Sequence, residues 1–494
     1  MRNTDQKEGK SMSYILALDA GTTQIKVALF DHDGAICASS QRRADVFFPA
    51  SGYVEQDPQQ IYQAVVEAIK DTLAKAGVQS DQVTSLGITN QRLTVMMWDI
   101  KTGQPVYNLI GWQDLRWPEK TPGLLARNTV EYTLASMVAG KILWLFDEFP
   151  DLRNRAERGE VVFGGVDTWL LWKLTKGQIL ATDVSNASTT ILFDRDHKCW
   201  NQTILSEVDI PLNIFPEVLE SGQFYAKIST PDLELTCPIT ALIADQQASL
   251  LGHRCFEPGQ AKVTLGTGSF VLVNTGDNLD KPPLGIIKHI AWSIHGDHCY
   301  AMEGSILSSG SALEWLVDGL GLLSSLSELE PLANSVDNNG GVYFVPALAG
   351  LGAPSWDTKA RGLLIGIDRG TQKGHIALAA IEALAFQVRE VIEAMQPAFL
   401  TTKTLSIDGR PTVNKRLVQT IADVCDLKVN AQLNYNLSLT GAAYCAGLAS
   451  GFWGSVSELS DFPDEVEAFF PAVNRDQDYF KWLEAVKRSR MWLE

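Results

Sequence analysis

The segment ILALDAGTT at residues 15–23 continues directly into IKVALF at 25–30, and this stretch decides the fold. Its apolar runs predict two strands joined by a tight Gly/Thr turn. A similar segment, KVTLGTG at 262–268 followed by FVLVN at 270–274, lies just past the middle of the chain. Because glycine has no Cβ, the tip of such a hairpin lets a phosphate approach the backbone N–H groups. Two tips facing each other would hold both ends of a polyphosphate.

The composition is that of a globular α/β protein with more than one domain. The chain has 494 residues, with 41 Lys and Arg against 58 Asp and Glu, a formal net charge of −17. Because the basic residues form no long run, we expect no nucleic-acid partner. The seven scattered cysteines include no C-x-x-C pair, which indicates a reducing, cytoplasmic compartment. No apolar run reaches about eighteen residues, so we expect no membrane span, and residues 1–12 are expected to form a flexible tail.

Strand and helix patterns alternate in both halves, which predicts an α/β protein of two lobes with a cleft between them. A buried strand at 238–244 runs into a helix headed by Asp245. A last helix at about 440–451 is rich in Gly and Ala, residues small enough for very close packing against a neighbour. Further helices are expected at about 61–76, 130–175, 310–317, 373–396 and 414–425, and further strands at 83–88, 95–99, 341–345 and 404–407.

Two other segments resemble the signatures of the FGGY group of carbohydrate kinases, whose fold is shared by actin, hexokinase and the 70-kDa heat-shock ATPase. Residues 362–382 are similar to the C-terminal signature at every defined position. Residues 136–148 are similar to the N-terminal signature, except that Val138 stands where a small residue is expected. Within the group, the segments most similar to glycerol kinases are 89–92, 107–114, 166–170, 182–188, 245–247 and 350–354.

This resemblance implies two ribonuclease-H-like domains that flank a cleft. Residues 13–255 would bind the acceptor and carry the catalytic base, and residues 256–494 would bind the nucleotide. The resemblance also implies ATP and Mg²⁺ as cosubstrate and cofactor, a small polyol or sugar as acceptor, and a homodimer or homotetramer.

Asp245 is the predicted catalytic base. It lies where a strand turns into a helix, and the helix dipole favours its ionised form. In a loose transition state for phosphoryl transfer the hydroxyl proton leaves late, so a carboxylate can accept it. Asp19 follows an apolar strand and precedes the first Gly/Thr tip, and we expect it to hold Mg²⁺ together with Asp245.

The resemblance places the nucleotide along both hairpins and on two later loops. The adenosine loop of related kinases is usually Asp-Gly-Gly, but Arg410 fills the second Gly position here. Either Arg410 stacks on the base with the same backbone, or nucleotide affinity is weakened. The expected nucleotide-binding residues are Gly21, Thr22, Thr23, Lys26, Gly266, Thr267, Gly310, Glu314, Gly409, Arg410 and Asn414.

The acceptor pocket departs from the glycerol kinase pattern at two positions. Leu93 stands where those enzymes carry a Glu that accepts from substrate hydroxyls, and Ser136 aligns with their pocket Tyr. Because a lost acceptor changes which hydroxyls a site can bind, we expect altered selectivity or a somewhat larger polyol or ketose. The expected acceptor-binding residues are Gln91, Arg92, Trp112, Ser136, Asp245, Gln246 and Phe270.

Two alternatives remain open at this point. One is a pentulose kinase for D-ribulose or D-xylulose, although such enzymes generally lack the segments at 90–92 and 107–108. The other is a nucleotide-gated binding or regulatory protein of actin-like fold, because the hairpins alone do not separate an enzyme from a binding protein.

Overall fold

The computed structural model describes residues 13–127, 129–278, 280–396, 398, 403–434, 436–463 and 465–493, so the tail expected at 1–12 lies outside it. In these residues no helix is both long and apolar enough to cross a bilayer. The main sheet is built from β1 (Tyr14–Ala20), β2 (Gln24–Phe30), β3 (Ile36–Arg43), β5 (Val83–Asn90), β13 (Gly222–Lys227), β14 (Pro238–Ala244), β15 (Ala261–Leu265), β16 (Ser269–Gly276), β17 (Ile287–Ile294), β18 (Asp297–Ile306), β21 (Thr404–Asp408), β22 (Lys428–Gln432) and β23 (Val466–Phe469).

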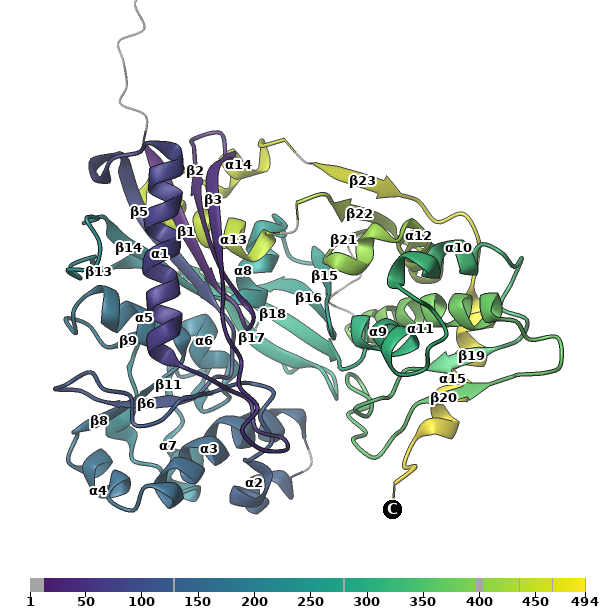
Figure 1. The fold of residues 1–494 in the computed structure, drawn as a ribbon, viewed down its shortest axis with the longest axis horizontal. Helices are drawn as coiled ribbons and strands as arrows, with labels where there is room; N and C mark the ends of the chain where they lie inside the picture. The colour runs from purple at the N-terminus through teal and green to yellow at the C-terminus, as the bar shows by residue number, and fades with distance from the viewer. Residues whose placement is uncertain are drawn as a thin grey trace, which may run out of the picture.

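These strands form one sheet in the order β23-β22-β21-β15-β16-β18-β17-β13-β14-β5-β1-β2-β3, which runs across the whole molecule (Figure 1). The order β3-β2-β1-β5-β14 in the first half matches β18-β16-β15-β21-β22 in the second. In each set the first three strands pair antiparallel and the last two add in parallel. The two sets meet through β13 and β17, which share a single paired position, Gly222 with Ile294. The repeat predicted from the sequence is therefore present in the sheet.

Both predicted hairpins are confirmed. β1 pairs with β2 from Ile15 opposite Phe30 to Ala20 opposite Ile25, and β15 pairs with β16 up to Leu265 opposite Ser269. The two Gly/Thr segments, 21–23 and 266–268, form the turns.

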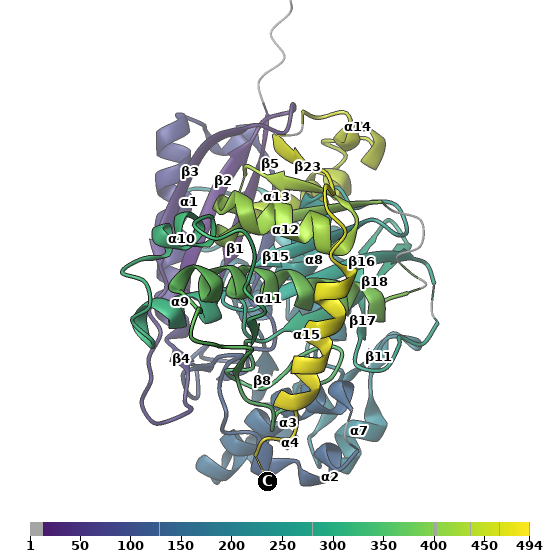
Figure 2. The same cartoon turned by 90° about the vertical axis from the view of Figure 1, so that its right-hand side faces the viewer.

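The helices cover both faces of the sheet, as Figures 1 and 2 show. On β1, alternate residues pack into different cores: Leu16 and Leu18 join the cluster that includes α1, whereas Ile15 and Ala17 join the cluster that includes α8 and α13. The helices are α1 (Pro58–Ala76), α2 (Pro122–Leu125), α3 (Val130–Glu148), α4 (Leu152–Glu157), α5 (Val166–Leu174), α6 (Val184–Thr189), α7 (Gln202–Glu207), α8 (Asp245–Gly252), α9 (Gly310–Asp318), α10 (Leu329–Ala333), α11 (Lys373–Ala394), α12 (Lys415–Cys425), α13 (Leu437–Ser450), α14 (Val456–Ser460) and α15 (Asp476–Ser489).

A long insertion between β5 and β14 forms the lower left part of Figure 1. It carries α2 to α7 and its own apolar core, in which Ile142 and Leu145 of α3 are buried. This insertion supplies α3 to one wall of the site described below. Its short strands, with those elsewhere outside the main sheet, are β4 (Glu55–Gln56), β6 (Met96–Asp99), β7 (Leu109–Ile110), β8 (Val161–Gly164), β9 (Ala181–Asp183), β10 (Phe193–Asp194), β11 (Cys199–Trp200), β12 (Glu217–Leu219), β19 (Tyr343–Val345) and β20 (Leu363–Ile365).

The helix rich in small residues packs as closely as predicted. A Cβ added to Gly441 of α13 would lie 1.8 Å from the carbonyl oxygen of Ala248 in α8, and one added to Gly252 of α8 would lie 2.1 Å from the oxygen of Leu437. The two helix backbones are therefore in direct contact. Since α8 begins at Asp245, this contact also fixes the backbone from which that carboxylate extends.

The prediction that α13 is the last element is wrong. The chain continues through α14, β23 and α15, and α15 buries Tyr479, Trp482 and Val486 against the second-half core. The five buried positions of α15 lie among exposed charged residues, so its apolar fraction is low although its buried face is well defined.

We expect Gly441→Ala to destabilise the protein, because the added methyl group would overlap a backbone oxygen. Overpacking of this kind costs about 1–3 kcal/mol, so the midpoint of thermal unfolding should fall in differential scanning calorimetry. The matched control is Gly123→Ala, whose Cβ would make only an ordinary contact of 3.8 Å with Glu207. Equal midpoints for the two variants would contradict the close contact of α8 and α13.

Candidate active site

One cavity of about 260 Å³ brings together the two hairpin tips and the head of α8. Thr22 comes from the first tip, Thr267 and Gly268 from the second, and Asp245 from α8. The two tips therefore face a shared space, as the sequence predicts. The other predicted residues that line it are Arg92, Trp112, Gln246 and Phe270.

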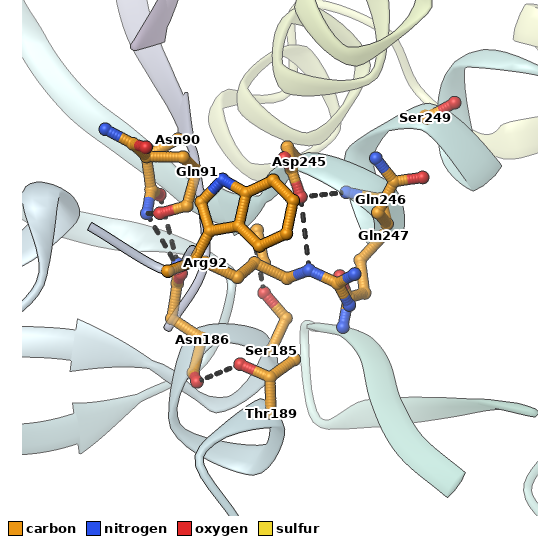
Figure 3. A network of polar contacts seen from close by, with 12 residues as sticks. Asn90, Gln91, Arg92, Ser185, Asn186, Thr189, Asp245, Gln246, Gln247 and Ser249 are labelled. Atoms are coloured by element: carbon orange, nitrogen blue, oxygen red, sulfur yellow. Dashed lines mark hydrogen bonds and ion pairs between the residues drawn. The ribbon is translucent and has the colours of Figure 1, made fainter. Parts of the chain in front are cut away.

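Asp245 is held through one of its two oxygens. Its Oδ1 accepts a hydrogen bond of 2.7 Å from the backbone N–H of Gln246 and lies 3.2 Å from Nε of Arg92 (Figure 3). Within the described chain, Oδ2 has no hydrogen-bond partner, and the side chain keeps 28% of its surface exposed. Burial raises the pKa of Asp245 above its ordinary value, although Arg92 opposes this change. The carboxylate is thus fixed in orientation and has one oxygen available.

Arg92 is fixed by a second carboxylate. Its two terminal nitrogens donate to Oε2 and Oε1 of Glu303 at 2.7 and 3.0 Å, and its guanidinium lies 5.6 Å from the ring centre of Phe270. Burial alone would raise the pKa of Glu303, but the charge and hydrogen bonds of Arg92, together with His289 and Lys262, outweigh it and lower that pKa to about 2. Such a bidentate pair sets the plane of the guanidinium as well as its position.

Lys262 lies behind Gln246, in the middle of strand β15. Its Nζ donates to Oε1 of Gln246 at 2.6 Å and to Oγ1 of Thr264 at 2.9 Å. Burial lowers the pKa of Lys262 to about 8, although Asp408 and Glu303 oppose the decrease. The side chain of Gln246 is therefore held by a buried cation.

Thr22 and Gln91 form a network beside the cavity. The hydroxyl of Thr22 donates to Oε1 of Gln91 at 3.0 Å and accepts from Nε1 of Trp112 at 3.2 Å. Nε2 of Gln91 donates to Oε1 of Gln56 at 2.6 Å, and Gln56 donates to the carbonyl of Thr22 at 3.0 Å. Gln91 does not line the cavity, so the structure places it in support of the hairpin tip.

Of the two residues that depart from the glycerol kinase pattern, one lines the cavity and the other does not. Leu93 lines the cavity and has a left-handed φ of 59°, a strained backbone for a residue with a Cβ. Its carbonyl accepts from Nζ of Lys141 at 3.1 Å, and the same Nζ donates to the carbonyl of Gly111 at 2.7 Å. The structure does not bring Ser136 to the cavity: it is fully buried in α3, and its neighbour Met137 lines the wall instead. A Tyr side chain at position 136 would extend much further than Ser136, whose short side chain stays within the buried face of α3.

Asp19 lies beside the first tip, paired across the hairpin with Lys26. Burial raises the pKa of Asp19 to about 7; Lys26 opposes this and Asp245 adds to it. Nζ of Lys26 donates to Oδ1 of Asn436 at 3.0 Å, so it also joins β2 to the start of α13. In the described ranges no three His, Cys, Asp or Glu side chains form a metal-binding group. The Asp19 and Asp245 carboxylates nevertheless fit Mg²⁺, which commonly takes one or two carboxylates and completes its shell with water and phosphate oxygens.

Three of the glycines predicted to bind the nucleotide, Gly266, Gly310 and Gly409, lie together at the end of β15. The N–H of Gly310, at the start of α9, donates to the carbonyl of Gly266 at 2.8 Å. Gly409 has a φ of 102°, and a Cβ there would lie 1.9 Å from the oxygen of Leu265. Only glycine fits this second approach.

The remaining predicted nucleotide residues surround that point. Arg410 is exposed and begins the 3₁₀ turn Arg410–Val413 without a left-handed φ, so its position does not require glycine. Asn414 caps α12 by accepting from the N–H of Leu417 at 2.9 Å, and Glu314 is exposed on α9. In the first tip, Gly21 donates its N–H to the carbonyl of Gln24, and Thr23 is exposed.

Sequence reasoning missed Glu303, Lys262 and His289. His289 lines the cavity, and burial lowers its pKa to about 3, so the imidazole is neutral. The available signal was a charged residue inside an otherwise apolar strand: Lys262 in AKVTL and Glu303 in YAMEGSI. A buried charge needs a partner, and the partner of Glu303, Arg92, comes from a distant part of the chain.

Glu303 supplies a test of the Arg92 pair through pH. The folded protein keeps Glu303 ionised to about pH 2 and the unfolded chain only to its ordinary pKa of 4.5. The stabilisation is therefore complete above the unfolded pKa and is lost as the pH falls toward the folded value. Between about pH 6 and about pH 3, the wild type should lose more free energy of unfolding than Glu303→Gln, measured by urea denaturation. The exposed Glu148→Gln should behave as the wild type; a Glu303→Gln curve parallel to the wild type would contradict the pairing.

Comparison with known proteins agrees with this geometry. Residues 14–252 match the N-terminal domain of the FGGY family of carbohydrate kinases, and residues 261–450 match its C-terminal domain. The chain is 41% identical to glycerol kinase 2 of Thermotoga maritima, over 97% of this chain and 99% of that protein. It is also 41% identical to glycerol kinase of Carboxydothermus hydrogenoformans, over 97% and 98%.

Solved structures give the same result. The crystal structure of Plasmodium falciparum glycerol kinase with ADP superposes with a TM-score of 0.88 at 30% identity, over 97% of this chain and 98% of that one. A xylulose kinase from Rhodospirillum rubrum gives 0.83 at 19% identity, over 96% and 98%, which supports the fold alone. The predicted fold class of two actin- and hexokinase-like domains is confirmed. The chain belongs to the FGGY family of carbohydrate kinases.

Proposed function

We propose that the protein transfers the terminal phosphoryl group of ATP to a primary hydroxyl of glycerol or of a closely related short acceptor. The observation that carries this proposal is Asp245, fixed through Oδ1 and free at Oδ2, in a cavity shared by both hairpin tips. The relatives named above support glycerol as the acceptor, since they are glycerol kinases at 41% identity.

Asp245 would act as the base. Its free Oδ2 would accept the proton of the attacking hydroxyl, while Arg92 and the N–H of Gln246 keep the carboxylate in place. Trp112 and Phe270 would pack against the carbon chain, and the cavity would exclude water from the reacting phosphate. Alignment and charge neutralisation, rather than covalent chemistry, would supply most of the catalysis.

The phosphates would lie between the two tips. Gly21, Thr22 and Thr23 would bind them from the first half, with Lys26 nearby. Gly266 and Thr267 would bind them from the second half. Mg²⁺ held by Asp19 and Asp245 would neutralise phosphate charge when bound.

The base and ribose would lie where α9 and the 3₁₀ turn after β21 approach each other. Gly310 and Gly409 let the backbone of these two segments pack directly against Gly266 and Leu265 at the end of β15. The exposed Glu314 and Arg410 would contact the nucleotide, and Arg410 would stack its guanidinium on the base. Asn414 would contribute through the capped start of α12.

Three expectations remain predictions. They are the division into an acceptor domain at 13–255 and a nucleotide domain at 256–494, the homodimer or homotetramer, and the pentulose kinase alternative. Analytical ultracentrifugation at the protein concentration of the assays tests the oligomeric state. Assays with glycerol, D-ribulose and D-xylulose as acceptors test the pentulose kinase alternative.

We expect Asp245→Asn to lower kcat by about 10²–10⁴-fold, the usual contribution of a general base. The measurement is ADP release with and without glycerol. Asp337→Asn, an exposed residue in the second half, is the matched control and should retain full activity. Undiminished glycerol-dependent turnover in Asp245→Asn would exclude the proposed base, whereas ATP turnover that ignores glycerol would favour a nucleotide-gated binding protein.

Removing Mg²⁺ with excess EDTA should stop turnover, and adding it back should restore activity. Asp19→Asn should require a higher Mg²⁺ concentration for half-maximal rate, because one of two carboxylates is lost. An Mg²⁺ titration of both proteins at saturating ATP and glycerol measures this. Superimposable titration curves would remove Asp19 from the metal site.

A further inference from the structure

We propose that the acceptor site favours a short α-hydroxyketone over the matching polyol, that is, an acceptor with a carbonyl beside the carbon that bears the reacting hydroxyl. This inference rests on the proposed phosphoryl transfer and names the substrate class of the same site. It follows from which polar groups of the cavity can donate a hydrogen bond and which can accept one.

Gln246 can only donate to a substrate. Nζ of Lys262 is a hydrogen-bond donor with no lone pair when charged, so the atom of Gln246 that it contacts at 2.6 Å must be the oxygen. The amide nitrogen of Gln246 is therefore turned away from Lys262. It has no hydrogen bond within the part of the chain that the structure describes, and Gln246 lines the cavity.

Arg92 is also a donor. A guanidinium carries five N–H groups and no acceptor. Glu303 and Asp245 fix its orientation, so it cannot turn away from the cavity. Two neighbouring side chains thus offer N–H groups to whatever oxygen lies beside the reacting hydroxyl.

Strong acceptors at the cavity are already occupied. Both oxygens of Glu303 accept from Arg92, and Oε1 also accepts from Ser305 at 3.3 Å. Of the Asp245 oxygens, Oδ1 is occupied and Oδ2 is needed for the reacting hydroxyl. Thr22 already donates its proton to Gln91 and accepts from Trp112, so it offers a neutral lone pair at most.

Leu93 removes a charged acceptor from this wall. It stands where the glycerol kinases that this chain resembles carry Glu, and it lines the cavity with Met137, Ile287 and Trp356. Among the described residues of the cavity, the proton of a second substrate hydroxyl would therefore find only neutral acceptors, such as the hydroxyls of Thr189, Thr267 and Ser305 and the ring of His289. Such a bond is weaker than one to a carboxylate, whereas a carbonyl has no proton to satisfy and accepts from Arg92 and Gln246.

The test compares two acceptor pairs that differ only in this group: dihydroxyacetone with glycerol, and hydroxyacetone with propane-1,2-diol. The full-length protein is assayed for ADP release, and kcat/KM of the ketone is divided by kcat/KM of the alcohol. We expect both ratios to exceed 1, by about ten-fold, because the second hydroxyl proton of the alcohol has no free charged acceptor among the described residues of the cavity.

Leu93→Glu restores a charged acceptor, and Leu93→Met keeps the wall apolar at similar size, so it is the matched control. Both ratios should fall about ten-fold or more in Leu93→Glu and stay near the wild-type values in Leu93→Met. Wild-type ratios at or below 1, or ratios that Leu93→Glu leaves unchanged, overturn the proposal. The wild-type ratios decide alone if Leu93→Glu does not fold. If none of the four acceptors stimulates ADP release, the proposed phosphoryl transfer is itself wrong.

Discussion

The backbone contact between α8 and α13 is the constraint on which the site depends. Gly441 and Gly252 let the two helices touch without side chains between them, and Gly87 lets α13 approach β5 in the same way. Asp245 is the first residue of α8, so this contact fixes the backbone from which its carboxylate extends, and Gln246 and Arg92 then orient the carboxylate. Close-packed protein interiors resist small displacements, so this contact holds the start of α8 rigidly in place.

Near the start of α8 the protein buries several charged side chains, and each of those named below has a polar partner. Arg92 is paired with Glu303 and Asp245, and Lys262 connects Gln246 to Thr264, which pairs in the sheet with Asp408 beside Gly409. Buried ion pairs add little net stability because desolvation offsets their attraction. Their effect here is orientation, since they fix which atoms of Arg92 and Gln246 face the cavity. The side-chain contacts from Gln246 to Thr264, with the strand pairing of Thr264 and Asp408, also join the acceptor side to the nucleotide loop.

The sequence was sufficient for the hairpins, for the buried strand Pro238–Ala244 and for the close packing of α13, because each depends on local pattern or residue size. It did not predict that the two halves share one sheet through Gly222 and Ile294, since strand pairing between distant segments leaves no local periodicity. Glu303 was missed for the same reason, because its partner Arg92 lies far along the chain, whereas Lys262 was missed because its contact with Gln246 depends on how β15 packs against α8. Ser136 was placed in the pocket by alignment, and the structure buries it within α3.

The left-handed backbone at Leu93 affects two properties of the protein in different ways, its stability and its choice of acceptor. A φ of 59° strains every residue with a Cβ, so glycine would relieve the strain at this position whatever the substrate. Directed evolution for heat resistance alone would weigh this relief against the packing of the Leu93 side chain on the core of the insertion. Directed evolution for a chosen acceptor would instead hold a large side chain there and accept the strain. A library varied at this one position would show a stability–activity trade-off in its simplest form.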